Sequence, residues 1–343
     1  MLALIESFRN DKSVETYLIC QKESYLSTRA AEMGTVVHEV DFFRGRLDPA
    51  VPYRLRQVLK SLDPDVVHAH GGRAGFFLSF VPRTSHNAAV LYTVHGYHFV
   101  HKRPVARLLG ALAEIWVSRR SDCTVFVSEY DRKTAVRSRI LSTESAGRVI
   151  RNAIDVDIIP LAAETDPRLL AFVGRLSYPK DPLLFVEVAR VLARDGYRFL
   201  ILGSGELEST VRERITLYGL ESVVTIKTGL GRAEALEDMR RASAVVMTSR
   251  WEGLPLTLLE AMTMGVPVVA AEVAGLAEVI ESDKTGVLIR GREPRDFADG
   301  IRRLCEDGTQ RERILLAARE HILVNFSHKK FIENYRDLYG LPP

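Results

Sequence analysis

Two glutamates at a fixed spacing, one expected in a loop and one in a helix, are the residues of this sequence best suited to ligand binding or catalysis. The stretch Ser249–Gly265 reads S-R-W-E-G-L-P-L-T-L-L-E-A-M-T-M-G, with Glu252 before the expected helix and Glu260 inside it. A proline near the start and a glycine at the end are typical helix boundaries. A helix N-terminus favours a phosphate group, and the residues that would present amides there are Gly253, Leu254, Pro255, Leu256 and Thr257.

Glu260 would lie two turns into this helix, between apolar neighbours on both sides. A buried carboxylate needs hydrogen-bond donors, and a ribose diol would supply two of them. An ion pair with an arginine or lysine would satisfy the same carboxylate. The spacing alone leaves both interpretations open.

Two cations follow an expected strand that ends at Val173. Gly174 and Arg175 come directly after it, and Lys180 follows Pro179. Cations at one strand end repel each other unless an anion lies between them, which favours a bound phosphate over a salt bridge. Gly203 and Gly205 follow another strand, where a tight turn explains them as well as a close ligand does.

Histidines are concentrated between His68 and His101, and the spacing His95-x2-His98-x2-His101 raises the question of zinc. A zinc site commonly includes a carboxylate or a further oriented ligand, and the sequence nearby offers no such signature. We therefore predict no metal site. His95 follows a strand directly and is expected to face a binding site, with a core or rim histidine as the alternative.

Short β-branched runs alternate with longer helical patterns, which predicts an α/β fold with doubly wound parallel sheets. Strands are expected at Thr16–Cys20, Val36–Val40, Val66–His70, Ala89–Val94, Thr124–Ser128, Leu169–Val173, Arg198–Leu202, Val223–Ile226, Ala244–Met247, Val268–Ala270 and Val287–Ile289. Helices are expected at Leu2–Phe8, Tyr53–Leu62, Val105–Arg119, Gln310–Val324 and His328–Tyr339.

A length of 343 residues predicts two domains. We assign 1–155 to a first Rossmann-like domain and 166–324 to a second, with a linker within Asn152–Pro167 and a last helix, 325–343, that could pack on the first domain. The three cysteines lack disulfide or zinc spacing, which fits a reducing cytoplasm. No apolar run is long enough to span a bilayer, and the N-terminus does not resemble a signal peptide.

A net charge of +3 is too small to indicate nucleic acid binding, but the cations are unevenly spread. Solvated helix faces and an anionic membrane surface explain such clusters about equally well. The two basic stretches consist of Lys102, Arg103, Arg107, Arg119 and Arg120, and of Arg132, Lys133, Arg137, Arg139 and Arg148.

The pattern Glu252-x7-Glu260, followed by A-M-x-x-G-x-P-V-V-A, resembles the signature of glycosyltransferase family 4 (group 1), retaining enzymes with the GT-B fold. The resemblance extends along the chain from about Leu2. The other matching segments are Asp65–His70, Thr93–Gly96, Asn152–Asp155, Val173–Leu176 with Lys180, Leu202–Glu206, and a turn containing Gly275 and Glu278 in which Ala274 replaces a glycine.

This resemblance implies two domains that face each other across a cleft, with a UDP- or GDP-sugar on the second and a glycan or lipid-linked acceptor on the first. It implies retention without a metal, a cofactor or a protein nucleophile, in polysaccharide or glycoconjugate synthesis, with peripheral contact at the inner face of the cytoplasmic membrane. It gives catalytic roles to His95, Glu252, Arg175 and Lys180, and donor contacts to Gly174, Arg175, Lys180, Gly203, Gly205, Glu252 to Thr257, and Glu260.

The sequence departs from the family at Leu2–Phe8, a helical pattern with no strand and glycine turn before it. We expect the first domain to lack a strand, and the chain as given to turn over poorly until upstream residues are added. A non-catalytic GT-B scaffold or partner subunit and a GT-B sugar epimerase stay as alternatives. A dinucleotide oxidoreductase is disfavoured, because no strand is followed by G-x-G-x-x-G.

Overall fold

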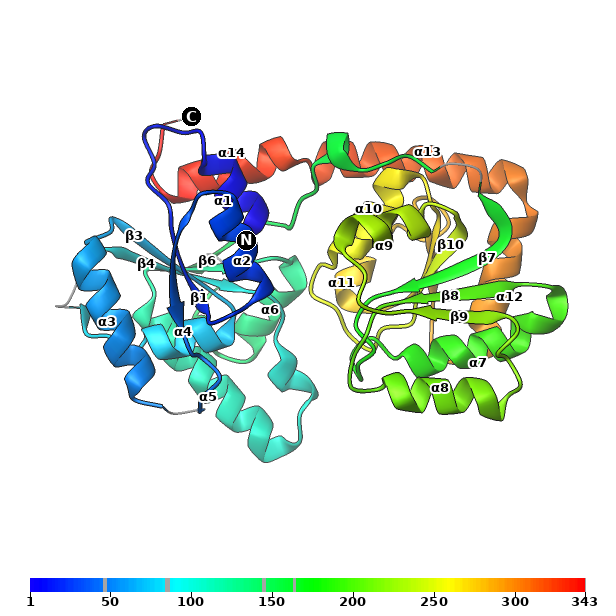
Figure 1. Cartoon of the computed structure of the whole chain (residues 1–343), viewed down its shortest axis with the longest axis horizontal. Helices are drawn as coiled ribbons and strands as arrows, with labels where there is room; N and C mark the ends of the chain where they lie inside the picture. The colour runs from blue at the N-terminus through cyan, green and yellow to red at the C-terminus, as the bar shows by residue number, and fades with distance from the viewer. Residues whose placement is uncertain (46–47, 84–86, 144–145, 163–164, 343) are drawn as a thin grey trace. The chain divides into compact units, whose positions relative to one another are not determined.

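The structure is a computed structural model that describes residues 1–45, 48–83, 87–143, 146–162 and 165–342. The chain forms two compact units (Figure 1). Unit 1 comprises Met1–Ile150 and Ile332–Pro343, and unit 2 comprises Arg151–Phe331. Residues 151–155, which the sequence interpretation assigned to the first domain, therefore lie in unit 2.

Unit 2 contains a parallel six-stranded sheet in its described residues, in the order β9-β8-β7-β10-β11-β12. Its strands are β7 (Asp166–Val173), β8 (Arg198–Leu202), β9 (Val224–Lys227), β10 (Ala242–Met247), β11 (Val268–Ala271) and β12 (Val287–Ile289). The helices are α7 (Pro182–Leu192), α8 (Glu208–Leu217), α9 (Arg232–Met239), α10 (Leu256–Met264), α11 (Ala274–Ala277), α12 (Pro294–Glu306) and α13 (Gly308–Asn325), with short 3-10 turns at Val156–Ile158 and Ala193–Asp195.

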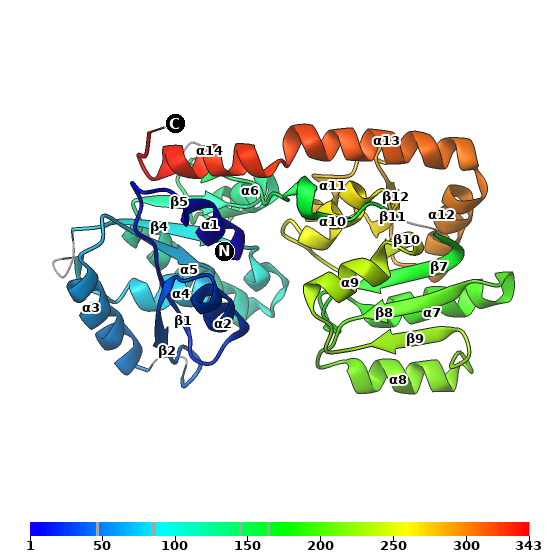
Figure 2. The ribbon, with the colours of Figure 1, turned by 45° about the horizontal axis from the view of Figure 1, so that its top comes forward.

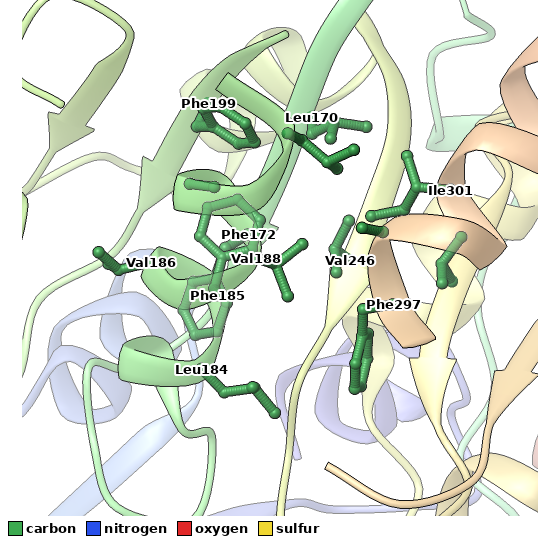
Figure 3. Packing of buried hydrophobic residues seen from close by; sticks show 14 of the residues in the cluster. Leu170, Phe172, Leu184, Phe185, Val186, Val188, Phe199, Val246, Phe297 and Ile301 are labelled. Carbon is green, nitrogen blue, oxygen red and sulfur yellow. The ribbon is translucent and has the colours of Figure 1, made fainter. Parts of the chain in front are cut away.

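The core of unit 2 explains why these strands are apolar along their whole length. Phe172 and Phe199 on neighbouring strands pack with Phe185 of α7, and Phe297 of α12 belongs to the same cluster (Figure 3). A parallel sheet covered by helices on both faces needs apolar residues on both sides of each strand. This core fixes the strand ends, and with them the loops that carry the candidate site.

Unit 1 contains two separate parallel sheets among its described residues, β1-β2 and β3-β4-β5-β6. The strands are β1 (Tyr17–Gln21), β2 (Val36–Val40), β3 (Val66–His70), β4 (Ala89–Val94), β5 (Cys123–Phe126) and β6 (Gly147–Val149). The helices are α1 (Leu2–Phe8), α2 (Tyr25–Glu32), α3 (Ala50–Leu62), α4 (Gly72–Leu78), α5 (Pro104–Arg120) and α6 (Glu129–Arg137), with a 3-10 turn, η2, at His98–His101. Helix α14 (His328–Leu338) enters unit 1 at Ile332.

The expected α/β class with parallel sheets is confirmed, and every expected strand is present within a few residues of its expected bounds. The short strand β6 was missed, because three residues carry no readable alternation. Helix α1 has the expected bounds, Leu2–Phe8. The two sheets of unit 1 are not hydrogen-bonded to each other in the described residues, so β1 and β3 each pair on one side only.

Candidate functional site

The strand order of unit 2 alone indicates which edge of its sheet is suited to bind a ligand. Strands β7, β8 and β9 follow one another outward on one side, and β10, β11 and β12 follow outward on the other. The order therefore reverses between β7 and β10. In open α/β sheets, ligands bind beyond the carboxyl ends of the strands at this reversal. The loops after Val173 and after Met247 meet there, and both carry residues that the sequence singled out.

The loop after β7 holds the two expected cations. Gly174 has a φ of +153°, which lets the backbone leave the strand sharply. The side chain of Arg175 is exposed, and it has no ion-pair or hydrogen-bond partner within the described part of the chain. Lys180 is partly buried and pairs with the loop after β10. Of these two cations, Arg175 is therefore the one whose guanidinium is fully available to an incoming anion.

Glu252 is held in place by two donors that reach the same carboxylate oxygen. Lys180 Nζ donates to Glu252 Oε1 at 2.5 Å, and Ser249 Oγ donates to the same oxygen at 2.6 Å. The ion pair is largely shielded, with 23% of the lysine and 9% of the glutamate side chain exposed. A lysine carries three N–H donors, so Lys180 can bind a phosphate oxygen while it stays paired with Glu252.

Helix α10 begins at Leu256, with Pro255 as its N-cap residue and no side chain capping the first turn. The sequence interpretation counted amides from Gly253 to Thr257, and this needs a correction, because Pro255 has no N–H to donate. The first free amides of the helix belong to Leu256 and Thr257. Asn152 Nδ2 donates to the carbonyl oxygen of Leu254 at 2.7 Å, so the expected linker residue fastens this loop.

Glu260 is 8% exposed and lies on the buried face of α10. Arg232, the first residue of α9, donates to Glu260 Oε1 from Nε at 2.9 Å and from its terminal nitrogen at 2.8 Å. The sequence left ribose binding and an arginine pair open, and the structure contains the arginine pair. A carboxylate accepts about four hydrogen bonds, so Glu260 retains capacity for ribose hydroxyls beside Arg232.

Three glycines allow the loops of the site to pack backbone against backbone. A Cβ at Gly203 would lie 2.1 Å from the carbonyl oxygen of Gly174, and one at Gly205 would lie 2.3 Å from that of Leu176. A Cβ at Gly275 would lie 1.8 Å from the carbonyl oxygen of Gly253. These contacts explain the glycines by packing between loops, and no ligand is needed to account for them.

A buried carboxylate that the sequence interpretation missed joins the same loops. Asp181 is 5% exposed, and its Oδ2 receives Arg250 at 2.7 Å and Arg292 at 2.5 Å. Arg292 also donates to the carbonyl oxygens of Thr248 and Ser249 at 2.6 and 3.0 Å. One signal in the sequence could have indicated this contact. Arg292 follows strand β12, so it reaches the same edge of the sheet as Asp181 and Arg250.

Tyr178 and Trp251, next to the donor residues in sequence, pack against each other with ring centroids 5.7 Å apart. The guanidinium of Arg250 lies 4.5 Å from the centre of the Tyr178 ring. The two aromatics therefore stabilise the loops by packing.

In unit 1, His95 lies just past the end of β4 and forms a cluster with His70. His70 Nδ1 and His95 Nε2 are 3.2 Å apart, while His68 contacts Tyr339 Oη at 2.8 Å and Thr93 Oγ1 at 2.7 Å. Desolvation by the surrounding protein atoms lowers the pKa of His95 to about 4 and that of His68 to about 3, and it lowers the pKa of His70 as well. The cluster is thus neutral at pH 7.

Among the described residues, no group of three or more histidine, cysteine, aspartate or glutamate side chains is arranged to hold a metal ion. None of the helices in the described ranges is both long and apolar enough to cross a membrane.

The close contact at Gly275 leads to a test of the site. We expect Gly275→Ala to displace the loop after Glu252, because the added methyl group would overlap the Gly253 carbonyl oxygen. The expected result is a lower melting temperature and at least about tenfold weaker binding of UDP or GDP, measured by thermal unfolding and calorimetry. Gly308→Ala is the control, because a Cβ there meets no atom within 4 Å. Equal behaviour of the two variants would contradict this role.

Comparisons with known proteins agree with the fold. The family model described as Glycosyltransferase Family 4 matches residues 3–158, and the model described as Glycosyl transferases group 1 matches residues 153–321. The second match covers the loops after β7 and β10 and the whole of α10.

A galactosyltransferase of Escherichia coli that uses UDP-Gal and α-D-GlcNAc-diphosphoundecaprenol is 24% identical, covering 94% of this chain and 88% of its own. The α-D-kanosaminyltransferase of Streptomyces kanamyceticus is 28% identical, covering 72% of this chain and 70% of its own. The crystal structure of Anabaena HepE with UDP and glucose superposes with a TM-score of 0.85 at 18% identity, over 99% of this chain and 95% of that one. The two family matches and the shared GT-B fold show that this chain belongs to the group 1, family 4 glycosyltransferases.

Proposed function

We propose that this glycosyltransferase binds a UDP- or GDP-sugar at the edge of unit 2 where the loops after β7 and β10 meet, and transfers the sugar with retention and without a metal ion. One observation supports this most strongly. The Lys180–Glu252 ion pair joins the loops after β7 and β10. Arg175, which has no partner in the described chain, lies on the first loop, and the uncapped start of α10 follows the second. Exposed positive charge at that point suits a diphosphate.

The diphosphate leaves with negative charge when the bond between the sugar and the phosphate breaks. Arg175, Lys180 and the amides at the start of α10 would stabilise that charge, which is the role a metal ion has in other enzymes. Glu252 orients Lys180 through the 2.5 Å ion pair. In this proposal the acceptor oxygen attacks the sugar on the face that the diphosphate leaves, so no protein nucleophile takes part.

Glu260 completes the donor site in this proposal by holding the ribose hydroxyls. His95 of unit 1 would contact the transferred sugar, and its low pKa makes it a neutral hydrogen-bonding group at pH 7. The acceptor would be a glycan or a lipid-linked glycan. The E. coli relative acts on a lipid-linked diphosphate acceptor, as its name states, and that supports the lipid-linked choice.

Removing both donor-site cations tests the diphosphate contacts. We expect Arg175→Ala with Lys180→Ala to weaken UDP or GDP binding at least about a hundredfold by calorimetry, because each charge-assisted hydrogen bond contributes about 1.5 kcal/mol or more. The control is Arg194→Ala with Arg302→Ala, which removes the same charge near the amino end of β8.

Thermal unfolding of each of these variants separates lost binding from lost folding, because Lys180 also pairs with Glu252. Unchanged nucleotide affinity in a folded double variant would place the diphosphate elsewhere.

The ribose contact is tested with a modified ligand. Glu260→Gln should weaken UDP binding by about tenfold to a hundredfold, yet leave the affinity for 2′,3′-dideoxy-UDP unchanged, because that ligand lacks both hydroxyls. Arg232→Gln removes the ion partner of Glu260 and keeps its carboxylate, so it should preserve the preference for UDP over the dideoxy ligand. Equal losses for both ligands in Glu260→Gln would show that the carboxylate has only a structural role.

We also propose peripheral binding of unit 1 to an anionic membrane through helix α5. Its exposed apolar side chains recur at helical spacing along one face, with 73% of Val105, 60% of Leu108 and 62% of Leu109 exposed. Leu112 and Trp116 continue the same face, at 52% and 40% exposure. Exposed apolar surface of this extent on a helix indicates an interaction site.

Charge points to the bilayer as the partner of this face. Exposed cations lie just before α5 and at its two ends, namely Lys102, Arg103, Arg107, Arg119 and Arg120. The single acidic residue between 102 and 120, Glu114, is turned inward, where Tyr92 Oη donates to it at 2.9 Å, and burial raises its pKa to about 7. An apolar stripe with cations at its ends is typical of helices that lie in the membrane interface.

Vesicle flotation tests this contact. The chain should bind vesicles of phosphatidylcholine with phosphatidylglycerol, and salt should weaken the binding. Leu108→Ser, Leu109→Ser and Leu112→Ser together should reduce it at least about tenfold, because each leucine loses apolar contact with the bilayer. Leu217→Ser with Leu316→Ser is the control, since both leucines are exposed in unit 2. Binding that needs neither the anionic lipid nor the three leucines would contradict the proposal.

A further inference from the structure

Two neighbouring strands of unit 1 gather three histidines at the carboxyl end of its sheet. Strands β3 and β4 pair in parallel, with His70 in register with Thr93. Alternate residues of a strand share a face, so His68 and His70 lie side by side on β3. His95 comes two residues after Thr93, and its ring meets that of His70. The backbone N–H of Gly71 donates to the carbonyl oxygen of Thr93 at 2.9 Å, which holds the two strands together at this end.

His68 has both ring nitrogens engaged inside unit 1. Nδ1 contacts Tyr339 Oη at 2.8 Å, and Nε2 contacts Thr93 Oγ1 at 2.7 Å. The ring of Tyr335 lies 5.8 Å from that of His68, so the last helix, α14, packs beside this sheet (Figure 2). The ring of His70 packs on the ring of His68, with the centroids 4.1 Å apart. His68 therefore holds His70 in place and keeps no ring nitrogen for a ligand.

The rings of His70 and His95 meet edge to edge. Nδ1 of His70 lies 3.2 Å from Nε2 of His95, the centroids are 5.5 Å apart, and the ring planes are 25° from parallel. The centroid distance exceeds the contact between the nitrogens by about the width of one imidazole ring, so both nitrogens lie between the ring centres. An N–H lies in the plane of its ring and here points at the lone pair of the other nitrogen. The contact is therefore a hydrogen bond.

Only one proton can lie between these two nitrogens. A neutral imidazole has one N–H donor and one bare nitrogen that accepts. Desolvation lowers the pKa of His70 and that of His95, so both rings are neutral at pH 7. Either Nε2–H of His95 donates to Nδ1 of His70, or Nδ1–H of His70 donates to Nε2 of His95.

The first of these two arrangements is favoured by the chemistry of the ring. The imidazole of histidine in water carries its proton mainly on Nε2, and the first arrangement keeps both rings in that form. The second needs both rings in the less favoured Nδ1–H form. Within the described part of the chain, neither Nε2 of His70 nor Nδ1 of His95 has a hydrogen-bond partner that would reverse this preference.

We propose that His70 is a positioning residue of the sugar site: it accepts a hydrogen bond from Nε2–H of His95, which leaves Nδ1 of His95 bare as an acceptor for a hydroxyl group of the transferred sugar. This inference rests on the proposed function, which gives the sugar contact to His95. His95 is exposed, so a ligand can reach it. A bare nitrogen cannot donate, so the site favours a sugar with a free hydroxyl at this point over a deoxy sugar.

Nitrogen NMR of the full chain with isotope-labelled histidine tests this assignment, because protonated and bare ring nitrogens resonate far apart. At pH 8, where both rings are neutral, we expect a proton on Nε2 of His70 and of His95 and none on Nδ1 of either. His70→Leu removes the acceptor, so both tautomers of His95 should be populated and its two nitrogen resonances should shift toward each other. His70→Asn keeps an acceptor oxygen near the position of Nδ1 and should restore the single tautomer.

The matched control is His38→Leu, because His38 lies on β2 and its buried Nε2 has no hydrogen-bond partner in the described residues. It should leave the resonances of His95 unchanged. Thermal unfolding shows that each variant is folded, and if His70→Leu is not, the unsubstituted chain and His70→Asn decide. A proton on Nδ1 of His95, or the same resonances with leucine as with histidine at position 70, overturns the proposal.

A second arm tests the sugar contact with UDP-glucose, UDP-galactose and GDP-mannose as probes. A probe that binds in calorimetry should shift the Nδ1 resonance of His95, whereas UDP and GDP alone should not. Equal shifts with and without the sugar, or no shift with a probe that binds, overturn the contact. Loss of all nucleotide binding would instead contradict the donor site of unit 2, and the tautomer measured without ligand would still decide the role of His70.

Discussion

The ion pair between Lys180 and Glu252 is the contact on which the rest of the candidate site depends. Lys180 belongs to the first half of the unit 2 sheet and Glu252 to the second, so the pair joins the two loops where the strand order reverses. A shielded pair of this kind is costly to break, because removal of one partner leaves a charge without a counterion. It keeps a cation at the point where a diphosphate would bind.

Other contacts join the same two loops and are present without a ligand. The backbone N–H of Arg250 donates to the carbonyl oxygen of Pro179 at 2.7 Å, which joins the two loops directly. Asp181 holds two arginines below them, and Gly275 lets α11 pack on the backbone of Gly253. A preorganised set of charges and amides can stabilise a leaving group without rearranging at the moment of reaction.

Much of this arrangement could be predicted from the sequence, because strand ends and helix starts have local signals. The apolar runs predicted the strands, and the site residues lie in the loops and the helix that follow β7 and β10, namely Arg175, Lys180, Glu252 and Glu260. The partners of these residues could not be predicted. Arg232 meets Glu260 from a different helix, and such a contact depends on packing that leaves no trace in local spacing.

The same limit explains why the contact between Asp181 and Arg292 could not be predicted. The two residues are 111 positions apart in the sequence and are joined by a hydrogen bond. Sequence patterns also could not show that Gly203 and Gly205 are needed for contacts between loops, since a turn or a ligand would select glycine equally well. In unit 1, the helix Leu2–Phe8 has its expected bounds, but local patterns could not show that β1 and β3 lie in separate sheets of the described residues.

A crystal structure of the chain with UDP or GDP tests the central claim most directly. Our account predicts diphosphate oxygens within hydrogen-bond distance of Arg175, Lys180 and the amides of Leu256 and Thr257, with the ribose hydroxyls on Glu260. Lys180 should remain paired with Glu252 in that complex. A nucleotide bound away from the loops after β7 and β10, or a diphosphate that contacts neither cation, would contradict the account.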